Sequence, residues 1–208
     1  MPSGPRDWEF LHVPDFLESL RSGDPEALGR LMDRLWAPLV GYARRILPEG
    51  FDPQDVVQEA FVRLWTKRAT LRNDGSLRAL LYTTVRNACL DEIRTSQRRR
   101  RLHTAEYRPS PAPGPYEDIQ GAELQRLAAA AVAKLPEKRQ EVFRLLREEG
   151  LSHRETAEVL GLSEQTVANH MSLALADLRA TLRPFVSDRE TPPTPREGAR
   201  PKGNPSGS

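Results

Sequence analysis

The stretch "SHRETAEVLGLSEQTVANHM", residues 152–171, predicts two short helices that meet at a tight corner. Ser152 and Glu155 form a capping box, which starts a helix because each side chain can accept a hydrogen bond from a backbone N–H group without a partner in the first turn. Gly161 ends that helix, since glycine takes the left-handed conformation at little cost. Ser163 then caps a second helix. This order of signals is typical of a helix-turn-helix.

In a helix-turn-helix the second helix enters the major groove of DNA, and polar side chains in its first turns can meet base edges. An ordinary helical hairpin inside a bundle would carry the same capping signals. The short polar face of the second helix is rich in hydrogen-bonding groups rather than in Lys and Glu, which favours the DNA-binding interpretation. The polar candidates on that face are Glu164, Gln165, Thr166, Asn169, His170 and Ser172.

The charge of this second helix is poorly suited to holding DNA alone. Residues 164–180 contain two acids and one arginine, whereas affinity for DNA comes largely from the neutralisation of phosphates by cations. We therefore expect another part of the chain, or a partner, to supply affinity.

Proline-rich segments divide the chain into modules. Prolines at 109, 111, 113 and 115 exclude a helix or a central strand there. The stretch after Arg183 is poor in apolar residues and rich in Pro and Gly, so we expect it to be disordered. The predicted parts are an N-terminal arm (1–14), a first module (15–101), a proline-rich linker (102–118), a second module (119–183) and a tail (184–208). Apolar residues within both modules recur at intervals of three and four, which predicts an all-α fold.

Composition limits the possible functions. The 208 residues carry a net charge of +2 although 29% of them are charged, so the location of the charges matters more than their sum. The single cysteine, Cys89, excludes an internal disulfide framework and a cysteine-based zinc site. We expect no metal or other cofactor. The apolar runs are too short to cross a bilayer, and the first residues lack the apolar core of a signal peptide, which predicts a cytoplasmic protein.

The first module carries the positive charge that the second helix of the corner lacks. Residues 72–101 include eight arginines against three acids, and five of these arginines, Arg94 and the run 98–101, lie near the end of one predicted helix. Arginines there would also suit the negative end of the helix dipole, so a stabilising or solvated role stays open. Tyr82 lies near Arg86 and Asn87, and such a set can stack on and bond an unpaired base. The spacing equally allows Tyr82 to be a core aromatic.

The preceding segment, "DPQDVVQEAFVRLW" (52–65), has the opposite sign. Its paired carboxylates could suggest a metal or acid-base site, but no histidine is placed to complete one. A solvated amphipathic face is the common alternative, and an acidic face edged with aromatic residues also suits docking onto the basic helices of another protein.

These blocks resemble the bacterial sigma factors of the sigma-70 family, extracytoplasmic-function (ECF) group. The resemblance rests on "DPQDVVQEAFVRLW", on "SLRALLYTTVRNACLDEIRTSQRRRR" and on "KLPEKRQEVFRLLREEGLSHRETAEVLGLSEQTVANHMSLALADLR", in that order, over about residues 15–183. It implies a non-enzymatic initiation subunit that binds core RNA polymerase, recognises the −35 and −10 promoter elements and helps melt the DNA. The first module would be sigma region 2, and the second would be sigma region 4.

The resemblance also implies roles for particular residues. Those expected to face the polymerase are Asp55, Gln58, Glu59, Phe61 and Leu64, with Trp65 either beside them or in the core. Those expected at the −10 element, including a base flipped from the melted strand, are Arg72, Asn73, Asp74, Ser76, Tyr82, Arg86, Asn87 and Arg94. Those expected at the −35 element are Gln165, Thr166, Asn169, His170 and Ser172, with Arg154 on a phosphate.

The chain departs from the family on the recognition helix. Members often carry Lys or Arg at the positions of Ala168, His170 and Leu173, and here only His170 could be positive. The −35 sequence and the strength of that contact are therefore open, and Ala168 and Leu173 can instead pack against a partner helix.

Other functions and partners also follow from the residues or from the resemblance. A stand-alone helix-turn-helix regulator would bind a palindromic operator as a dimer, but it would not need the acidic face at 55–65. An enzyme acting on nucleic acid would need a nucleophile beside an activating group or a metal cluster, and the sequence places neither. The resemblance further implies an anti-sigma factor as a partner that covers both modules.

Overall fold

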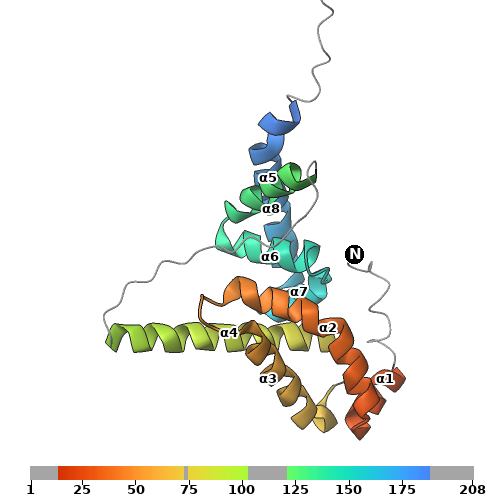
Figure 1. Cartoon of the computed structure of the whole chain (residues 1–208). Helices are drawn as coiled ribbons and strands as arrows, with labels where there is room; N and C mark the ends of the chain where they lie inside the picture. The colour runs from red at the N-terminus through yellow and green to blue at the C-terminus, as the bar shows by residue number, and fades with distance from the viewer. Residues whose placement is uncertain (1–13, 73–74, 103–120, 188–208) are drawn as a thin grey trace, which may run out of the picture.

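The computed structural model describes residues 14–72, 75–102 and 121–187, which form α-helices and one short 3₁₀ turn with no strand among them. The prediction of an all-α fold is confirmed. The first module contains α1 (Pro14–Ser22), α2 (Pro25–Ile46), α3 (Pro53–Thr66), the 3₁₀ turn η2 (Arg68–Thr70) and α4 (Leu77–Leu102). The second contains α5 (Gly121–Ala133), α6 (Glu137–Arg147), α7 (His153–Leu160) and α8 (Glu164–Ser187), as Figure 1 shows.

Two helices of the first module begin with the same cap. Asp24 accepts a hydrogen bond from the backbone N–H of Glu26 at 2.9 Å, and Asp52 accepts one from that of Gln54 at 2.8 Å. A proline follows each aspartate, where its missing N–H costs nothing and its fixed φ suits the first turn. These caps set where α2 and α3 start.

Pro38 lies inside α2, where we expected either a new helix segment or a kink. The helix is assigned without interruption from Pro25 to Ile46, so a new segment is wrong. A proline in a helix interior removes one intrahelical hydrogen bond and crowds the preceding turn. The ribbon of α2 bends along its length in Figure 1, in agreement with the kink.

The core of the first module joins one face of each of its α-helices. Its fully buried side chains include Leu20, Leu31, Leu35, Leu39, Val57, Leu81, Tyr82, Val85 and Cys89. Trp36 stacks on Phe61 with ring centroids 6.1 Å apart. Burial raises the pKa of the Cys89 thiol to about 12, so this cysteine is held as an unreactive thiol in the folded protein.

The second module has two small cores that follow one another along a single face of α8. Residues of α5 and the turn after it, namely Ala131, Val132 and Leu135, meet Ala174 and Leu178 of α8. Nearer the corner, Val142 of α6 and Ala157 of α7 meet Val167 and Met171. Because the buried positions of α8 repeat every three or four residues, its opposite face is left toward solvent.

The predicted corner has the expected caps. Ser152 accepts from the backbone N–H of Glu155 at 3.1 Å, and Glu155 accepts from that of Ser152 at 2.8 Å, which completes the capping box. Gly161 has a φ of 64° and ends α7. The backbone N–H of Thr166 donates to Ser163 at 3.1 Å at the start of α8. The helix-turn-helix prediction is confirmed in its geometry.

The predicted boundaries agree less well at the end of the second module. Helix α8 continues to Ser187, so the end expected at Arg183 is four residues too early. The N-terminal arm up to residue 13, residues 103–120 of the linker region and the tail from residue 188 lie outside the described residues. No helix in the described ranges is both long and apolar enough to cross a membrane.

The two modules pack against each other, which the sequence did not predict. Helix α7 lies along the first part of α4 (Figure 1). Leu145, Leu151 and Val159 of the second module belong to the apolar core of the first. The α4–α7 contact brings the corner close to the predicted −10 residues.

Replacing Gly161 with alanine should cost about 1–2 kcal/mol of unfolding free energy, because an L-residue is strained in the left-handed conformation. A Cβ there meets no atom within 4 Å, so the loss measures the backbone alone. The matched control is Gly29→Ala in α2, where a Cβ also meets nothing and alanine should stabilise the helix slightly. Urea unfolding measures the unfolding free energy of both variants. Equal values for the two variants would contradict a left-handed conformation at Gly161.

Candidate nucleic-acid interface

The exposed face at the start of α8 carries the residues expected at the −35 element. Gln165, Asn169 and Ser172 are exposed, while Thr166 and His170 are half-buried. The amide nitrogen of Gln165 donates to Oδ1 of Asn169 at 3.1 Å, so one face of the helix presents a pair of amides. Such groups can form two hydrogen bonds to a base edge.

Two departures from the family pattern are also visible on this helix. Leu173 is 46% exposed, which is unusual for a large apolar side chain, and Ala168 is half-buried. Both therefore remain available, at least in part, to pack against another helix.

Arg154 lies on α7, next to the corner. It is exposed, and its Nε lies 3.3 Å from Oε1 of Glu158 one turn along the same helix. An exposed pair of this kind contributes little to stability, so Arg154 can exchange this partner for a phosphate without a large loss.

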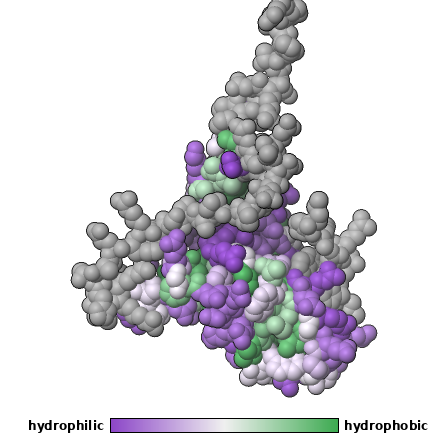
Figure 2. Space-filling view, viewed as in Figure 1, coloured by the Kyte–Doolittle hydropathy of each residue, from purple (hydrophilic) through white to green (hydrophobic). Residues whose placement is uncertain are grey.

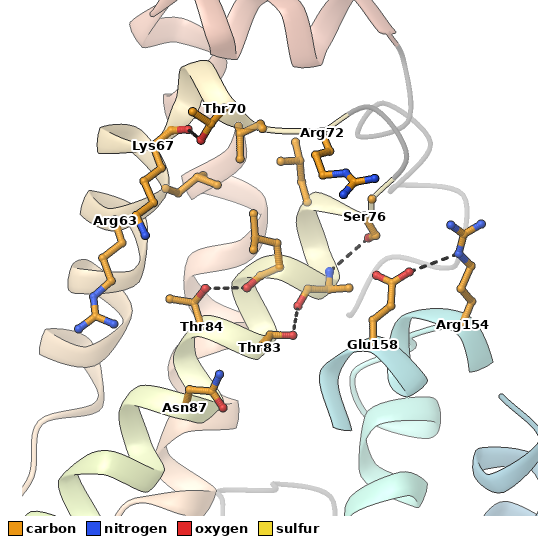
Figure 3. Close-up of a pocket in the computed structure, with 16 residues that line it drawn as sticks. Arg63, Lys67, Thr70, Arg72, Ser76, Thr83, Thr84, Asn87, Arg154 and Glu158 are labelled. Carbon is orange, nitrogen blue, oxygen red and sulfur yellow. Dashed lines mark hydrogen bonds and ion pairs between the residues drawn. The ribbon is translucent and has the colours of Figure 1, made fainter. Parts of the chain in front are cut away.

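A pocket of about 760 Å³ lies between α3, α4 and α7. Figure 3 shows Arg63 of α3 and Lys67 just after it on one side, Arg72 and Ser76 in the segment before α4, and Arg154 with Glu158 of α7 opposite. Its apolar lining residues are Leu64, Leu71, Leu77, Ala79 and Leu80. Apolar groups flanked by several cations suit a flat base with its phosphate.

The structure brings only some of the predicted −10 residues to this pocket. Arg72, Ser76 and Asn87 line it, whereas Asn73 and Asp74 lie outside the described residues. Arg94 is exposed farther along α4, where its Nη1 lies 2.9 Å from Oδ1 of Asp91. Exposure of Arg94 fits either a phosphate contact or a solvated role.

Ser76 has a structural role that the sequence did not reveal. Its hydroxyl accepts from the backbone N–H of Ala79 at 3.2 Å, so it caps the start of α4. The same hydroxyl donates to Oε1 of Glu155 at 2.7 Å, across the contact between the modules. Ser76 therefore joins the cap of α4 to the capping box of α7.

Tyr82 is not available to stack on a base in this conformation. Its side chain is fully buried, and its ring lies edge-on to that of Tyr42 with centroids 5.1 Å apart. Its hydroxyl donates to Oε2 of Glu149 at 2.7 Å. Burial raises the pKa of Tyr82 to about 12. Of the two roles left open for Tyr82, the structure shows the core aromatic, and stacking on a base stays a prediction.

Arg86 and Arg78 also face the second module. Nε of Arg86 donates to Oε1 of Glu141 at 2.6 Å. Arg78 is 3% exposed and donates to the backbone carbonyls of Glu149 and Gly150. Sequence reasoning missed Arg78, although its i, i+4 spacing to Tyr82 and from there to Arg86 places all three on one helical face.

The face expected to meet the polymerase is only partly on the surface. Asp55, Gln58 and Glu59 are exposed on α3. Phe61 and Leu64 are 3% and 5% exposed and belong to the core, so they are covered in this conformation, and their contact with polymerase stays a prediction. The period of α3 turns them inward beside Val57 and Ala60.

Trp65 lies at the edge of the α3 surface. It is half-buried, packs against the core of the first module and has the guanidinium of Arg68 4.5 Å from its ring centroid. Both alternatives for it therefore stay open. Among the residues that the structure describes, no group of three or more His, Cys, Asp or Glu side chains could hold a metal ion.

Comparison with known families matches both modules. The family model "Sigma-70 region 2" matches residues 31–99, and "Sigma-70, region 4" matches residues 125–178. The RNA polymerase sigma factor CnrH of Cupriavidus metallidurans is 33% identical over 172 residues, which cover 77% of this chain and 89% of CnrH. The chain belongs to the sigma-70 family of sigma factors. Within that family it falls in the ECF group.

Other relatives agree with this membership. The ECF RNA polymerase sigma factor SigL of Mycobacterium tuberculosis is 29% identical, with 78% of this chain and 94% of SigL covered. RfaY of Xanthomonas campestris pv. campestris, also named as an RNA polymerase sigma factor, is 28% identical over 77% of this chain. The sigma factor described here spans 42% of the length of RfaY.

Solved structures of similar fold contain partner proteins. CnrH in complex with the cytosolic domain of CnrY superposes with a TM-score of 0.57 at 27% identity, covering 86% of this chain and 99% of CnrH. The sigma factor RpoE of Bartonella quintana, in complex with the anti-sigma factor NepR, gives 0.59 at 21% identity, with 74% and 96% covered. The second likeness concerns the fold alone.

The stability contributed by Glu155 should depend on pH. Burial raises the pKa of Glu155, but hydrogen bonds from the Ser152 backbone and the Ser76 hydroxyl and the charge of Arg78 outweigh it, so the pKa lies below its ordinary 4.5. A lowered pKa means that this contribution is complete above 4.5 and is lost as the pH falls through the folded-state value. Glu155→Gln should therefore lose about 2 kcal/mol of unfolding free energy at neutral pH and less in acid.

The matched control for this prediction is Glu158→Gln, an exposed carboxylate on the same helix with an arginine partner. It should change stability by less than about 1 kcal/mol at any pH. Denaturant unfolding of both variants across the acid range measures the effect. If the loss of unfolding free energy in Glu155→Gln does not change with pH, the charge of Glu155 does not supply this stability.

Proposed function

We propose that this sigma factor binds core RNA polymerase, recognises the −35 and −10 promoter elements and helps to melt DNA at the start of transcription. The observation that carries the proposal is the pairing of two unlike DNA-facing features in one chain. One is the capped corner with an exposed amide pair on α8. The other is the cation-flanked apolar pocket beside the start of α4.

The corner suits duplex DNA. The buried face of α8 holds the helix against α6 and α7, which leaves Gln165, Asn169 and Ser172 exposed along the other side. The helix carries few cations, so we assign it to reading sequence rather than to supplying affinity. Arg154 supplies a phosphate contact beside it.

The pocket suits an unpaired base. Extruding a base from the duplex costs a few kcal/mol, which contacts in a pocket must offset. Apolar lining residues give a surface for the ring, Asn87 supplies an amide, and Arg63, Lys67 and Arg72 lie where the flanking phosphates would pass. Arg94, exposed farther along α4, extends this cationic path.

The acidic face of α3, formed by Asp55, Gln58 and Glu59, is proposed to dock on a basic surface of core polymerase. Simultaneous binding by polymerase and by two DNA elements gives avidity, which accounts for a recognition helix with so few positive charges. The complexes of CnrH with CnrY and of RpoE with NepR support an anti-sigma factor as a further partner.

Run-off transcription tests the function directly. Purified chain is mixed with core RNA polymerase of its host and genomic fragments, and transcripts are compared with those made by core enzyme alone. New, reproducible start sites that share two upstream elements are expected. DNA binding by the free chain without any association with core enzyme would contradict the proposal.

Reversing the acidic face should separate polymerase binding from folding. Asp55→Lys with Glu59→Lys places like charges against a basic partner, so binding to core polymerase should weaken at least about tenfold. The pair Asp15→Lys with Glu18→Lys on α1 is a matched control, because Glu59 and Glu18 each form an exposed ion pair along their own helix. Affinity is measured by fluorescence titration with core enzyme. Equal effects of both pairs would refute the assignment to α3.

Removing one amide from α8 should change the reading of one base pair. Asn169→Ala should cost about 1–3 kcal/mol of binding at a single −35 position if Asn169 bonds a base edge. Binding of holoenzyme to promoters with each −35 position varied in turn measures this cost. A loss of the same size on every promoter variant would show that Asn169 does not read sequence.

A further inference from the structure

Leu173 is a large apolar side chain on the exposed face of α8. It is 46% exposed, and the other large apolar side chains that are exposed in the described part of the chain, Val62 and Leu80, lie on α3 and α4 of the first module. An uncovered leucine leaves the free energy of apolar burial unused. A binding partner that covers Leu173 would gain that free energy.

The position of Leu173 places it in line with the amide pair of α8. Residues 165, 169 and 173 are spaced by four, so their side chains follow one another along one face of the helix. The amide nitrogen of Gln165 donates to Oδ1 of Asn169 at 3.1 Å, and Leu173 comes one turn later. Val167 and Met171 are buried on the other side. The exposed face therefore changes along its length from hydrogen-bonding groups to an apolar group.

This face of α8 has no formally charged side chain to hold a phosphate. Residues 165–176 include no Lys, Arg, Asp or Glu. Ser172 and Ala176, which lie beside Leu173 on the helix, are exposed and small. A face with this composition is better suited to base edges, which carry sequence information, than to the charged backbone of DNA.

The major groove of DNA offers one methyl group, that on C5 of thymine, among hydrogen-bond donors and acceptors. An amide side chain can form two hydrogen bonds to adenine, whereas an apolar side chain suits the methyl group of thymine. Over any other base edge, Leu173 would cover a donor or an acceptor without replacing its hydrogen bond to water, which costs binding free energy. The order of groups on α8 therefore fits a thymine close to a base that an amide reads.

A helix of a protein partner would also cover an apolar side chain, but the surroundings of Leu173 do not suit one. Helices that bind in this way use several apolar anchors spaced at i, i+3, i+4 and i+7. The neighbours of Leu173 on this face are Asn169, Ser172 and Ala176. None of them is a large apolar side chain, so Leu173 does not belong to an apolar stripe.

We propose that Leu173 is a specificity-determining residue of the −35 contact and selects a thymine by its C5 methyl group. Four residues of α-helix span about 6 Å, and successive base pairs are about 3.4 Å apart. The thymine should therefore lie within about two base pairs of the pair that Asn169 reads. This inference rests on the proposed function and adds one base to the −35 sequence.

Replacing thymine with deoxyuridine tests the proposal, because deoxyuridine lacks only the C5 methyl group and keeps every hydrogen-bonding group of thymine. Each thymine of the −35 element is replaced in turn, on either strand, in a promoter mapped by run-off transcription. Holoenzyme binding is then measured by fluorescence titration. At one position the wild type should lose about fourfold in affinity, the size expected for one buried methyl group. In Leu173→Ala that loss should fall below about twofold.

Val62→Ala is the matched control, since it also removes exposed apolar atoms but does so on α3. Holoenzyme with this variant should keep the full deoxyuridine effect. Alanine is the best helix former, so Leu173→Ala should unfold at the same urea concentration as the wild type. On the deoxyuridine promoter, wild type and Leu173→Ala should bind almost equally, which completes a cycle between the side chain and the methyl group.

An equal deoxyuridine effect in wild type and Leu173→Ala would overturn the proposal, as would a −35 element in which no thymine methyl group affects binding. Weaker binding of Leu173→Ala to core polymerase, with the deoxyuridine effect unchanged, would assign Leu173 to a protein contact instead. Failure of the proposed function looks different. In that case neither protein directs transcription by core polymerase, no −35 element is mapped, and both proposals are wrong.

Discussion

The packing of the two modules depends on the burial of one positively charged side chain, Arg78. Arg78 is almost completely buried, and an unpaired buried charge would cost several kcal/mol. Its partners are two backbone carbonyls of the turn at residues 149–150 and the carboxylate of Glu155, all from the second module. Burial lowers the pKa of Arg78, with the neighbouring Tyr82 and Glu155 acting against that shift. Arg78 can therefore stay buried with its charge paired only while α7 packs on α4.

The same contact joins local structure to function. Glu155 completes the capping box of α7 and bonds Ser76, which caps α4. The corner that presents Gln165 and Asn169 is thus fixed to the helix that carries Tyr82 and Arg86. Under the proposed function, a recognition helix with few cations takes its place on DNA through the rest of this chain and through polymerase rather than through its own charge.

Local signals in the sequence predicted the corner well, because its caps depend on residues only a few positions apart. Ser152, Glu155, Gly161 and Ser163 adopt the predicted roles. The sequence was less informative where a role depends on distant partners. Periodicity puts Tyr82, Phe61 and Leu64 on helical faces but does not say which faces are covered. Arg78 was missed because its partners lie more than seventy positions away along the chain.

The distance between the two modules of the free chain, compared between the unchanged protein and Arg78→Met, tests the role of this buried arginine most directly. With dyes on Val62→Cys of α3 and Ala180→Cys of α8, both exposed, we expect a single short distance when Arg78 is present, because its guanidinium joins α4 to the turn at 149–150 and to Glu155. We expect a longer distance in Arg78→Met, which lacks these hydrogen bonds and the ion pair. The same distance in both proteins would contradict the claim that Arg78 holds the modules together.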